Sequence, residues 1–246
     1  MTTPHKESHT LTLQLGETAD PVRIALPPGD IPAEGILPAL RVMTNAVIDH
    51  AITATRAKGR PISCKPGCAT CCRHLVLLSD IEARALADLV ANMPEPRRST
   101  VRARFAATQL RMAAAGLAES ADNPAELPVD YLKELAYRYF QQRIDCPFLE
   151  DEQCSIYADR PLACRKVVVT SPAEFCADPG DDRLAYVRVA PVGAAVLLVT
   201  SDEAPPQPAG VFLPYMLDWA AAHTAPGPRR RADQWMQRFV ERLATA

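Results

Sequence analysis

Apolar residues recur with the spacing of an amphipathic helix in the first quarter of the chain. Between Ile36 and Arg56 the apolar positions fall at Leu37, Leu40, Met43, Val47, Ile48, Ala51 and Ile52. Residues three and four apart share one face of a helix, and the sequence Gly59-Arg60-Pro61 that follows would end it. The pattern predicts a helix that packs against the core.

A helix start is recognisable at Ser79-Asp80-Ile81-Glu82. In this capping box the Ser hydroxyl and the Glu carboxylate satisfy each other's free backbone amides. We therefore expect a helix over Asp80–Ala91. Helical periodicity predicts four more helices, over Arg97–Ala115, from near Pro128 to Arg143, over Val211–His223 and over Arg231–Leu243.

Alternating apolar and polar side chains predict short strands. Thr10–Leu15 and Pro21–Leu26 flank a turn and predict a hairpin, and Tyr186–Val189 and Ala194–Val199 are later strand candidates. Cys146–Cys176 is rich in charge and Pro, so we expect a loop with one short helical turn that burial alone holds weakly. The fold class is therefore α+β, mainly helical, with short strands and a cysteine-rich metal-binding loop region.

A chain of 246 residues can form one large domain or two small ones. Three sections are distinguishable: an N-terminal hairpin and core helix at 1–60, a cysteine-cluster metal-binding region at 61–180, and C-terminal strands and helices at 181–246. We expect these sections to fold together as one cooperative domain.

The charge balance limits the range of partners. The chain has 27 Lys and Arg against 29 Asp and Glu, a formal net charge of −2, which argues against a general binder of nucleic acids or other polyanions. It has no apolar run long enough to cross a bilayer, and residues 1–10 lack the charged-then-apolar order of a signal peptide. We therefore expect a cytoplasmic protein with no membrane partner.

Eight cysteines carry the chemistry that the sequence makes visible. They form two groups, Cys64-x3-Cys68-x2-Cys71-Cys72 and Cys146-x7-Cys154-x9-Cys164-x11-Cys176. In a reducing cytosol such thiols are metal ligands or small buried side chains more often than disulfides. Adjacent cysteines cannot easily bond to each other, and inert core thiols do not explain four cysteines within nine residues. Metal binding is the favoured interpretation, ahead of a disulfide framework and of inert thiols.

The short gaps in the first group let successive sulfurs turn towards one centre, and Lys65-Pro66-Gly67 supplies a turn. Thiolates suit Zn²⁺ or an iron–sulfur cluster and not Ca²⁺ or Mg²⁺. Eight thiolates could build two tetrahedral zinc sites, or one four-ligand cluster with spare cysteines. A doubled cysteine crowds two thiolates near one centre, which favours an iron–sulfur cluster over zinc.

Several polar residues flank the cysteines. His74 could add a nitrogen ligand, although a supporting position beside the ligands is favoured. Arg73, Arg160 and Arg165 could lower the pKa of nearby thiols, or they could pair with the acidic turn Glu150-Asp151-Glu152. The sequence leaves both roles open.

The order of these motifs is similar to that of a known family. Cys64-Lys-Pro-Gly-Cys68-Ala-Thr-Cys71-Cys72-Arg73 is followed by Cys146-Pro-Phe-Leu149, by Cys154-Ser-Ile-Tyr157 and by Arg160-Pro-Leu-Ala-Cys164-Arg165. Over about Cys64–Cys176 the chain resembles the YkgJ-type cysteine-cluster family of zinc- or iron-chelating CxxCxxCC domains. It has one more residue in the first gap than the family name implies.

The resemblance implies the metal ligands Cys64, Cys68, Cys71, Cys72, Cys146, Cys154 and Cys164. Cys176 lies outside the core motif and is added for its thiol chemistry alone. A flagellin lysine methylase has a similar cysteine pattern and is regarded as an iron–sulfur protein, which also favours iron–sulfur.

The leading hypothesis is a cytosolic metal-binding protein that holds an iron–sulfur cluster or zinc. One alternative is an iron–sulfur-supported methyltransferase acting on protein lysine. Another is a structural zinc module that presents a surface to an unknown protein partner. No motif names a substrate, so the sequence leaves open whether the chain is an enzyme.

Overall fold

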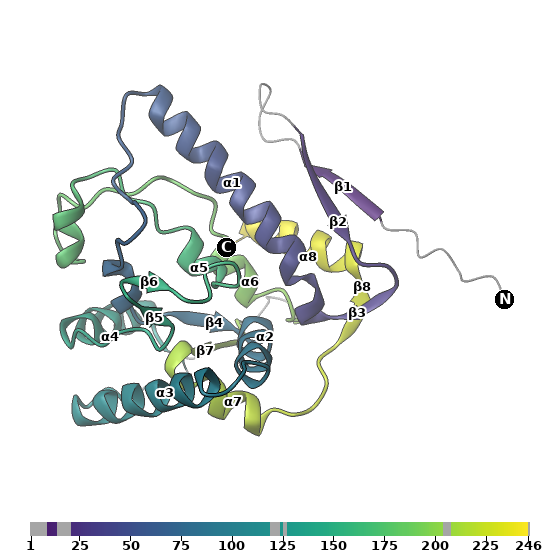
Figure 1. Cartoon of the computed structure of the whole chain (residues 1–246). Coiled ribbons are helices and arrows are strands. Elements are labelled where there is room, and N and C mark those ends of the chain that lie inside the picture. The colour runs from purple at the N-terminus through teal and green to yellow at the C-terminus, as the bar shows by residue number, and fades with distance from the viewer. Residues whose placement is uncertain (1–8, 14–20, 119–123, 125–126, 204–207, 246) are drawn as a thin grey trace.

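The computed structural model describes residues 9–13, 21–118, 124, 127–203 and 208–245, and over these ranges the protein is mainly helical (Figure 1). The strands are β1 (His9–Leu13), β2 (Val22–Leu26), β3 (Asp30–Pro32), β4 (Leu77–Ser79), β5 (Leu149–Glu150), β6 (Gln153–Cys154), β7 (Gly210–Phe212) and β8 (Arg229–Arg231). The α-helices are α1 (Leu37–Ala57), α2 (Asp80–Ala91), α3 (Arg97–Ala114), α4 (Val129–Gln141), α5 (Leu162–Arg165), α6 (Val192–Leu197), α7 (Met216–Ala222) and α8 (Ala232–Thr245). Short 3-10 helices are η1 (Ala33–Ile36), η2 (Thr70–Arg73), η5 (Ala173–Ala177) and η6 (Leu213–Tyr215).

The strands pair only in twos within the described ranges, always antiparallel: β1 with β2, β3 with β8, β4 with β7 and β5 with β6. The predicted class, α+β and mainly helical with short strands, is therefore confirmed. No helix in the described ranges is both long enough and apolar enough to cross a membrane.

The amino-terminal hairpin and the first helix form where the sequence predicts them. β1 and β2 pair with Leu11 opposite Ile24, and the predicted turn at 16–20 lies outside the described residues. The helix α1 begins and ends within one residue of its predicted limits. The capping box at Ser79 starts α2, which covers the predicted range.

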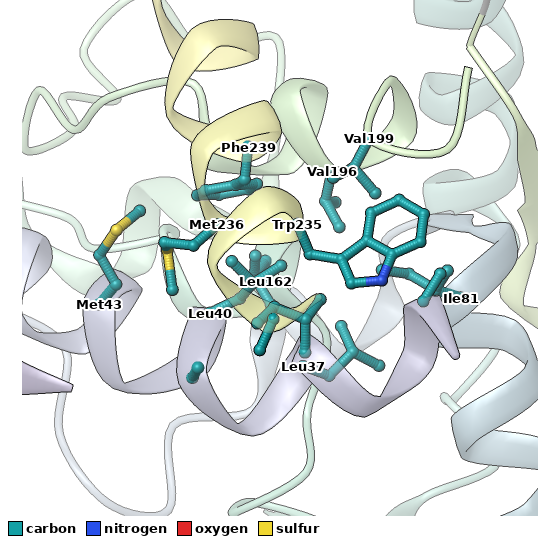
Figure 2. Close-up of a cluster of buried hydrophobic side chains, with 14 of the residues drawn as sticks. Leu37, Leu40, Met43, Ile81, Leu162, Val196, Val199, Trp235, Met236 and Phe239 are labelled. Carbon is teal, nitrogen blue, oxygen red and sulfur yellow. The ribbon is translucent and has the colours of Figure 1, made fainter. Parts of the chain in front are cut away.

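The largest buried cluster joins both ends of the chain to the cysteine region. Figure 2 shows this cluster, in which Trp235 and Phe239 of α8 are gathered with Leu40 and Met43 of α1. Leu162, the first residue of α5, belongs to the same cluster and is 0 % exposed. Sections 1–60, 61–180 and 181–246 therefore contribute to one buried cluster, while their division remains a prediction.

A second cluster includes residues of the small sheet β4–β7 and of α3. It contains Leu78, Phe105, Phe148 and Ile156, and the rings of Phe105 and Phe148 meet edge to face with centroids 5.4 Å apart. Phe148 and Ile156 are only 1 % and 6 % exposed. Apolar side chains of Cys146–Cys176 thus enter the buried clusters, and how strongly burial alone holds this segment stays a prediction.

The segment predicted as a strand at Ala194–Val199 is instead a helix, α6, over Val192–Leu197. The carbonyl of Pro191 accepts hydrogen bonds from the amides of Ala194 and Ala195, which starts the helix. The segment is a short apolar run, and periodicity alone does not separate a buried helix from a buried strand in such a run. The contacts of α6 with α5 and α8 decide the outcome.

The helix predicted over Val211–His223 begins later than expected. Val211 and Phe212 belong to β7 and pair with β4, and α7 starts only at Met216. Pairing with β4 keeps Val211 and Phe212 extended, and the 3-10 turn η6 then precedes α7. Of the strand predicted at Tyr186–Val189, Tyr186 forms one isolated bridge with Val169.

The predicted loop at Cys146–Cys176 contains more regular structure than expected. In addition to α5, which is the expected helical turn, it holds the β5–β6 hairpin and the 3-10 helix η5. The hairpin pairs Leu149 with Cys154. The turn between its strands contains Asp151 and Glu152 with positive φ angles of 48° and 55°.

Glu82 connects the first turn of α2 to the start of α5. Its Oε2 accepts hydrogen bonds from the Ser79 amide at 3.0 Å and the Ser79 hydroxyl at 2.8 Å, as in a capping box. Its Oε1 accepts one from the Leu162 amide, 80 residues away, at 2.8 Å. Glu82 is 2 % exposed. Water therefore cannot take the place of its carboxylate as the acceptor for the Ser79 and Leu162 amides.

We expect Glu82→Ala to lower the free energy of unfolding by about 2–5 kcal/mol, because it leaves buried backbone amides without acceptors. Urea unfolding followed by circular dichroism measures the loss. Glu95→Ala is the matched control, since Glu95 accepts hydrogen bonds from Ser99 near the start of α3 but is exposed to solvent. Equal losses in the two variants would show that the link to Leu162 contributes nothing.

Candidate metal centre

The eight cysteines lie on short elements and loops between the longer helices. Cys64 and Cys68 are in the loop after α1, Cys71 and Cys72 are in η2, and Cys146 follows α4. The other three are in the elements β6, α5 and η5, as Cys154, Cys164 and Cys176. All eight are free thiols.

The turn between Cys64 and Cys68 has the form that the sequence predicts. The Cys68 amide donates to the Lys65 carbonyl at 3.1 Å, and Gly67 has a positive φ of 80°. Pro at the second position and Gly at the third are typical of a type II turn. The turn reverses the chain between the first two thiols.

Backbone hydrogen bonds join the segments that carry the cysteines. The Cys146 amide donates to the Cys72 carbonyl at 2.9 Å, which ties the end of α4 to η2. The Val169 amide donates to Cys64 Sγ at 3.2 Å, and the Ser63 amide donates to the Val169 carbonyl at 2.9 Å. Together with contacts between η2 and η5, these bonds bring the two cysteine groups to one region.

Five of the thiols line one cavity of about 900 Å³. They come from both sequence groups and are Cys71, Cys72, Cys146, Cys154 and Cys164. Cys64, Cys68 and Cys176 do not line it. The convergence of the two groups is thus seen for five cysteines, and the other three lie outside this cavity.

The thiols divide into two sets according to which of them shift one another's pKa. Burial raises the pKa of Cys146 to about 12, and neighbouring Cys154 and Cys71 raise it further. Burial raises the pKa of Cys164 and of Cys154 as well. We call Cys72, Cys146, Cys154 and Cys164 the inner set.

The outer set consists of Cys64, Cys68 and Cys176. Burial raises the pKa of Cys64, with Cys68 and Cys71 adding to the shift. Burial also raises the pKa of Cys176, again reinforced by the other thiols of this set and by Cys71. Cys71 therefore influences both sets and lies between them.

Cys71 is the thiol that ionises most readily of those whose pKa shifts. A hydrogen bond from the Cys72 thiol lowers the pKa of Cys71 to about 7, and the Arg160 cation contributes in the same direction. The same hydrogen bond raises the pKa of Cys72, which is the donor. The doubled cysteine thus supplies one thiolate and one thiol that stabilises it.

The three arginines that flank the cysteines have different roles. Arg73 pairs with Asp145 at 2.7 Å and with Glu152 at 2.9 Å, which attaches η2 to the loops that follow α4 and β5. Arg165 is 4 % exposed and donates to the carbonyls of Arg160 and Ala158. Pairing with the acidic turn is therefore confirmed for Arg73.

Arg160 faces the cysteines. Its guanidinium lies 4.0 Å above the ring of Tyr157, and it lines the thiol cavity. Its positive charge lowers the pKa of Cys64, Cys71 and Cys154. This arginine therefore offsets negative charge on thiolates of both sets.

His74 lies beside the cysteines, against the ring of Phe140. The two ring centroids are 4.8 Å apart, and burial lowers the pKa of His74. Its ring lines the thiol cavity. The position is compatible with a neutral imidazole beside the inner set.

The donor set suits zinc or iron, because thiolates prefer such soft or borderline metals. A single Zn²⁺ with bonds of about 2.3 Å would need its sulfurs within about 4 Å of one another. Across the described ranges, no three His, Cys, Asp or Glu side chains are placed to hold one ion. The thiols thus have the right chemistry for a metal group, and the described residues form no preassembled three-ligand site for one ion.

Comparison with known families supports this chemistry. Residues 63–179 match the family model CxxCxxCC, described as a "Putative zinc- or iron-chelating domain". The cysteine region of this chain is thus similar to CxxCxxCC domains, as its cysteine spacing indicates. Neither a curated protein nor a solved structure matches the chain significantly.

Two features of the site were not predicted from the sequence. The capping box identifies Glu82 but gives no sign that its second oxygen accepts from Leu162. The cavity extends from the thiols to residues 186–189 and α6, where no metal-binding motif occurs. The apolar character of residues 186–189 and of α6 was the sequence feature that came closest to indicating this cavity wall.

In metal-free protein at pH 7, we expect iodoacetamide to modify Cys71 about tenfold faster than Cys64. Both thiols are exposed, but the pKa of Cys71 is lowered to about 7 whereas that of Cys64 is raised, and the thiolate is the reactive form. Peptide mass spectrometry at timed intervals measures the two rates.

The variant Cys72→Ala is the control for this prediction. It removes the hydrogen-bond donor that stabilises the Cys71 thiolate, so the rate advantage of Cys71 should shrink. Equal rates in the unaltered protein, or an advantage that survives Cys72→Ala, would contradict the assignment.

Proposed function

We propose that this protein holds an iron–sulfur cluster on the four thiols of the inner set, with Cys71 lying between this cluster and the outer set. The observation that carries the proposal is that five cysteines from both sequence groups line one cavity. These five include the doubled cysteine and the three residues Cys146, Cys154 and Cys164. Sulfur-only donors around one space are typical of such clusters.

The size of the cavity favours a cluster over a single zinc ion. Its volume of about 900 Å³ exceeds the space that one ion fills. The Arg160 cation beside the thiols would offset part of the negative charge of a thiolate-ligated cluster.

The outer set is proposed as a second metal site. Cys64, Cys68 and Cys176 influence one another and Cys71 electrostatically, so four thiols are available there. Cys64 and Cys71 are exposed, which would let a zinc or iron ion enter from solvent. The eight cysteines would then serve as two groups of four that meet at Cys71 and Cys72.

The enzymatic alternative is a methyltransferase that acts on protein lysine. The residues lining the cavity include no Asp or Glu, so the cavity has no carboxylate for the sulfonium and ammonium groups of S-adenosylmethionine. Calorimetric titration of the metal-replete protein with S-adenosylmethionine tests this alternative directly. A structural zinc module would instead contain zinc alone and would fold only with the metal.

The two proposed sites can be separated by one cysteine substitution in each. After anaerobic purification, we expect Cys164→Ala to lose the visible absorption, the sulfide and the iron of the cluster. We expect Cys176→Ala to keep the colour and to lose about one equivalent of metal. Elemental analysis, sulfide assay and absorption spectra give the three readouts, and circular dichroism checks that both variants fold.

Other outcomes of this experiment have definite meanings. Loss of all metal in both variants would show a single site that uses both sets. A colourless protein with one or two equivalents of zinc, purified from iron-replete cells, would replace iron–sulfur by zinc. Metal-free protein of unchanged stability would refute metal binding altogether.

Chelation should loosen the first cysteine loop while the helices remain. Most residues from 58 to 67 are exposed, and the contacts at Ser63 and Cys64 are among the few that attach the loop, whereas ligation can contribute roughly 10–16 kcal/mol in small zinc peptides. We expect chelation to speed tryptic cleavage after Lys58, which is exposed and followed by Gly59, and to leave helical circular dichroism nearly unchanged.

Lys133 gives an internal control for that digestion. It is exposed but lies within α4, so its cleavage should not respond to the chelator. Equal acceleration at both lysines would indicate global unfolding, and unchanged cleavage at Lys58 would show that metal does not order this loop.

A further inference from the structure

The cavity beside the inner thiols is much larger than a metal group needs. At about 900 Å³ it lies within the range of pockets that bind small organic molecules, roughly 300–1,000 Å³. The thiols supply only part of its lining. Much of the rest comes from β4, from α6 and from the segments 166–167 and 186–189.

The part of the wall away from the thiols is mainly apolar. Val76 and Leu77 contribute from the β4 region, Ala194 and Leu197 from one face of α6, and Val189 from the segment before α6. Ala194 and Leu197 are three residues apart in the helix and so share a face. Such a wall suits the apolar body of a ligand.

The charged residues of the lining are all positive. They are Arg160, Lys166 and Arg188, and no Asp or Glu lines the cavity. Arg160 acts on the thiols, whereas Lys166 and Arg188 are not among the main influences on any thiol pKa. Their charges therefore remain available to another anion.

Lys166 and Arg188 differ from Arg73 and Arg104 in having no acidic partner among the described residues. Arg73 and Arg104 form ion pairs with carboxylates, but no ion pair or side-chain hydrogen bond involves Lys166 or Arg188 within the described part of the chain. The Val187 amide donates to the Val168 carbonyl at 2.8 Å. This bond pairs the two segments that carry the cations, and Arg188 is exposed.

We propose that this part of the cavity binds an amphipathic organic anion, with its apolar body between β4 and α6 and its anionic head at Lys166 and Arg188. The two cations at this end of the cavity favour an anion over a cation of the same shape. Lysine and arginine side chains both bind carboxylates and phosphates, so the anionic head of the ligand is one of these two groups. The inference does not depend on which metal the thiols hold.

Calorimetric titration of the full-length, metal-containing protein tests this inference with four probes below their micelle concentrations. Decanoate and decyl phosphate carry both features, decanol has the same chain without charge, and inorganic phosphate has charge without the chain. We expect one or both amphipathic anions to bind, decanol to bind at least tenfold more weakly, and inorganic phosphate not to bind detectably. The tighter of the two anions identifies the preferred head.

Substitutions locate the ligand. The double variant Lys166→Gln with Arg188→Gln should weaken binding of the anion by about tenfold or more, since it removes both free cations. The matched control is Lys133→Gln with Arg138→Gln, which removes one lysine and one arginine from the exposed face of α4 and should leave binding unchanged. Ala194→Phe should abolish binding by filling the apolar part of the cavity.

The metal content of each sample is measured in parallel, so failure of this inference is distinguishable from failure of the metal proposal. Absence of binding by either anion to metal-replete, folded protein would overturn the inference. Equal affinity for decanol and decanoate would overturn the role of charge, as would unchanged affinity in the Lys166→Gln, Arg188→Gln variant.

Discussion

Both carboxylate oxygens of Glu82 accept hydrogen bonds in the interior, one from Ser79 at the start of α2 and the other from the Leu162 amide at the start of α5. The position of Cys164 depends on this link, because α5 has only four residues and so short a helix is not stable by itself. Its last residue, Arg165, is held in turn by carbonyl groups of the preceding loop. Buried polar contacts at both ends therefore place Cys164 beside thiols that are far away in the sequence.

Bringing many thiols together has an electrostatic cost that shapes the rest of the site. Burial and neighbouring thiols raise the pKa of most inner cysteines, so these residues are protonated in the absence of metal at neutral pH. Cys71 differs because the thiol of Cys72 donates to it. A bound metal would have to displace the remaining protons, and Cys71 offers the first thiolate to which it could bind. Arg160 supplies positive charge at the same place.

The cavity combines two environments that serve different chemistry. Soft sulfur donors and Arg160 lie at one end, and apolar side chains with two further cations lie at the other. The cysteine motifs match the CxxCxxCC model, whose description names zinc or iron chelation. The second environment is built partly by α6 and residues 186–189, which lie outside the matched range of 63–179. The polypeptide around the domain thus shapes the space next to the thiols.

The sequence by itself determined the local structure and the donor chemistry. Periodicity defined α1 and α8, the capping box defined α2, and cysteine spacing defined the metal-binding class, because each depends on residues close together in the chain. Only the tertiary structure decided that Ala194–Val199 is largely helical, since α5 and α8 pack against it. The tertiary structure also decided that five of the eight cysteines share a cavity and that Glu82 reaches Leu162. Contacts across 80 or more residues leave no local pattern, so spacing alone predicts which groups can bind a metal but not which of them meet.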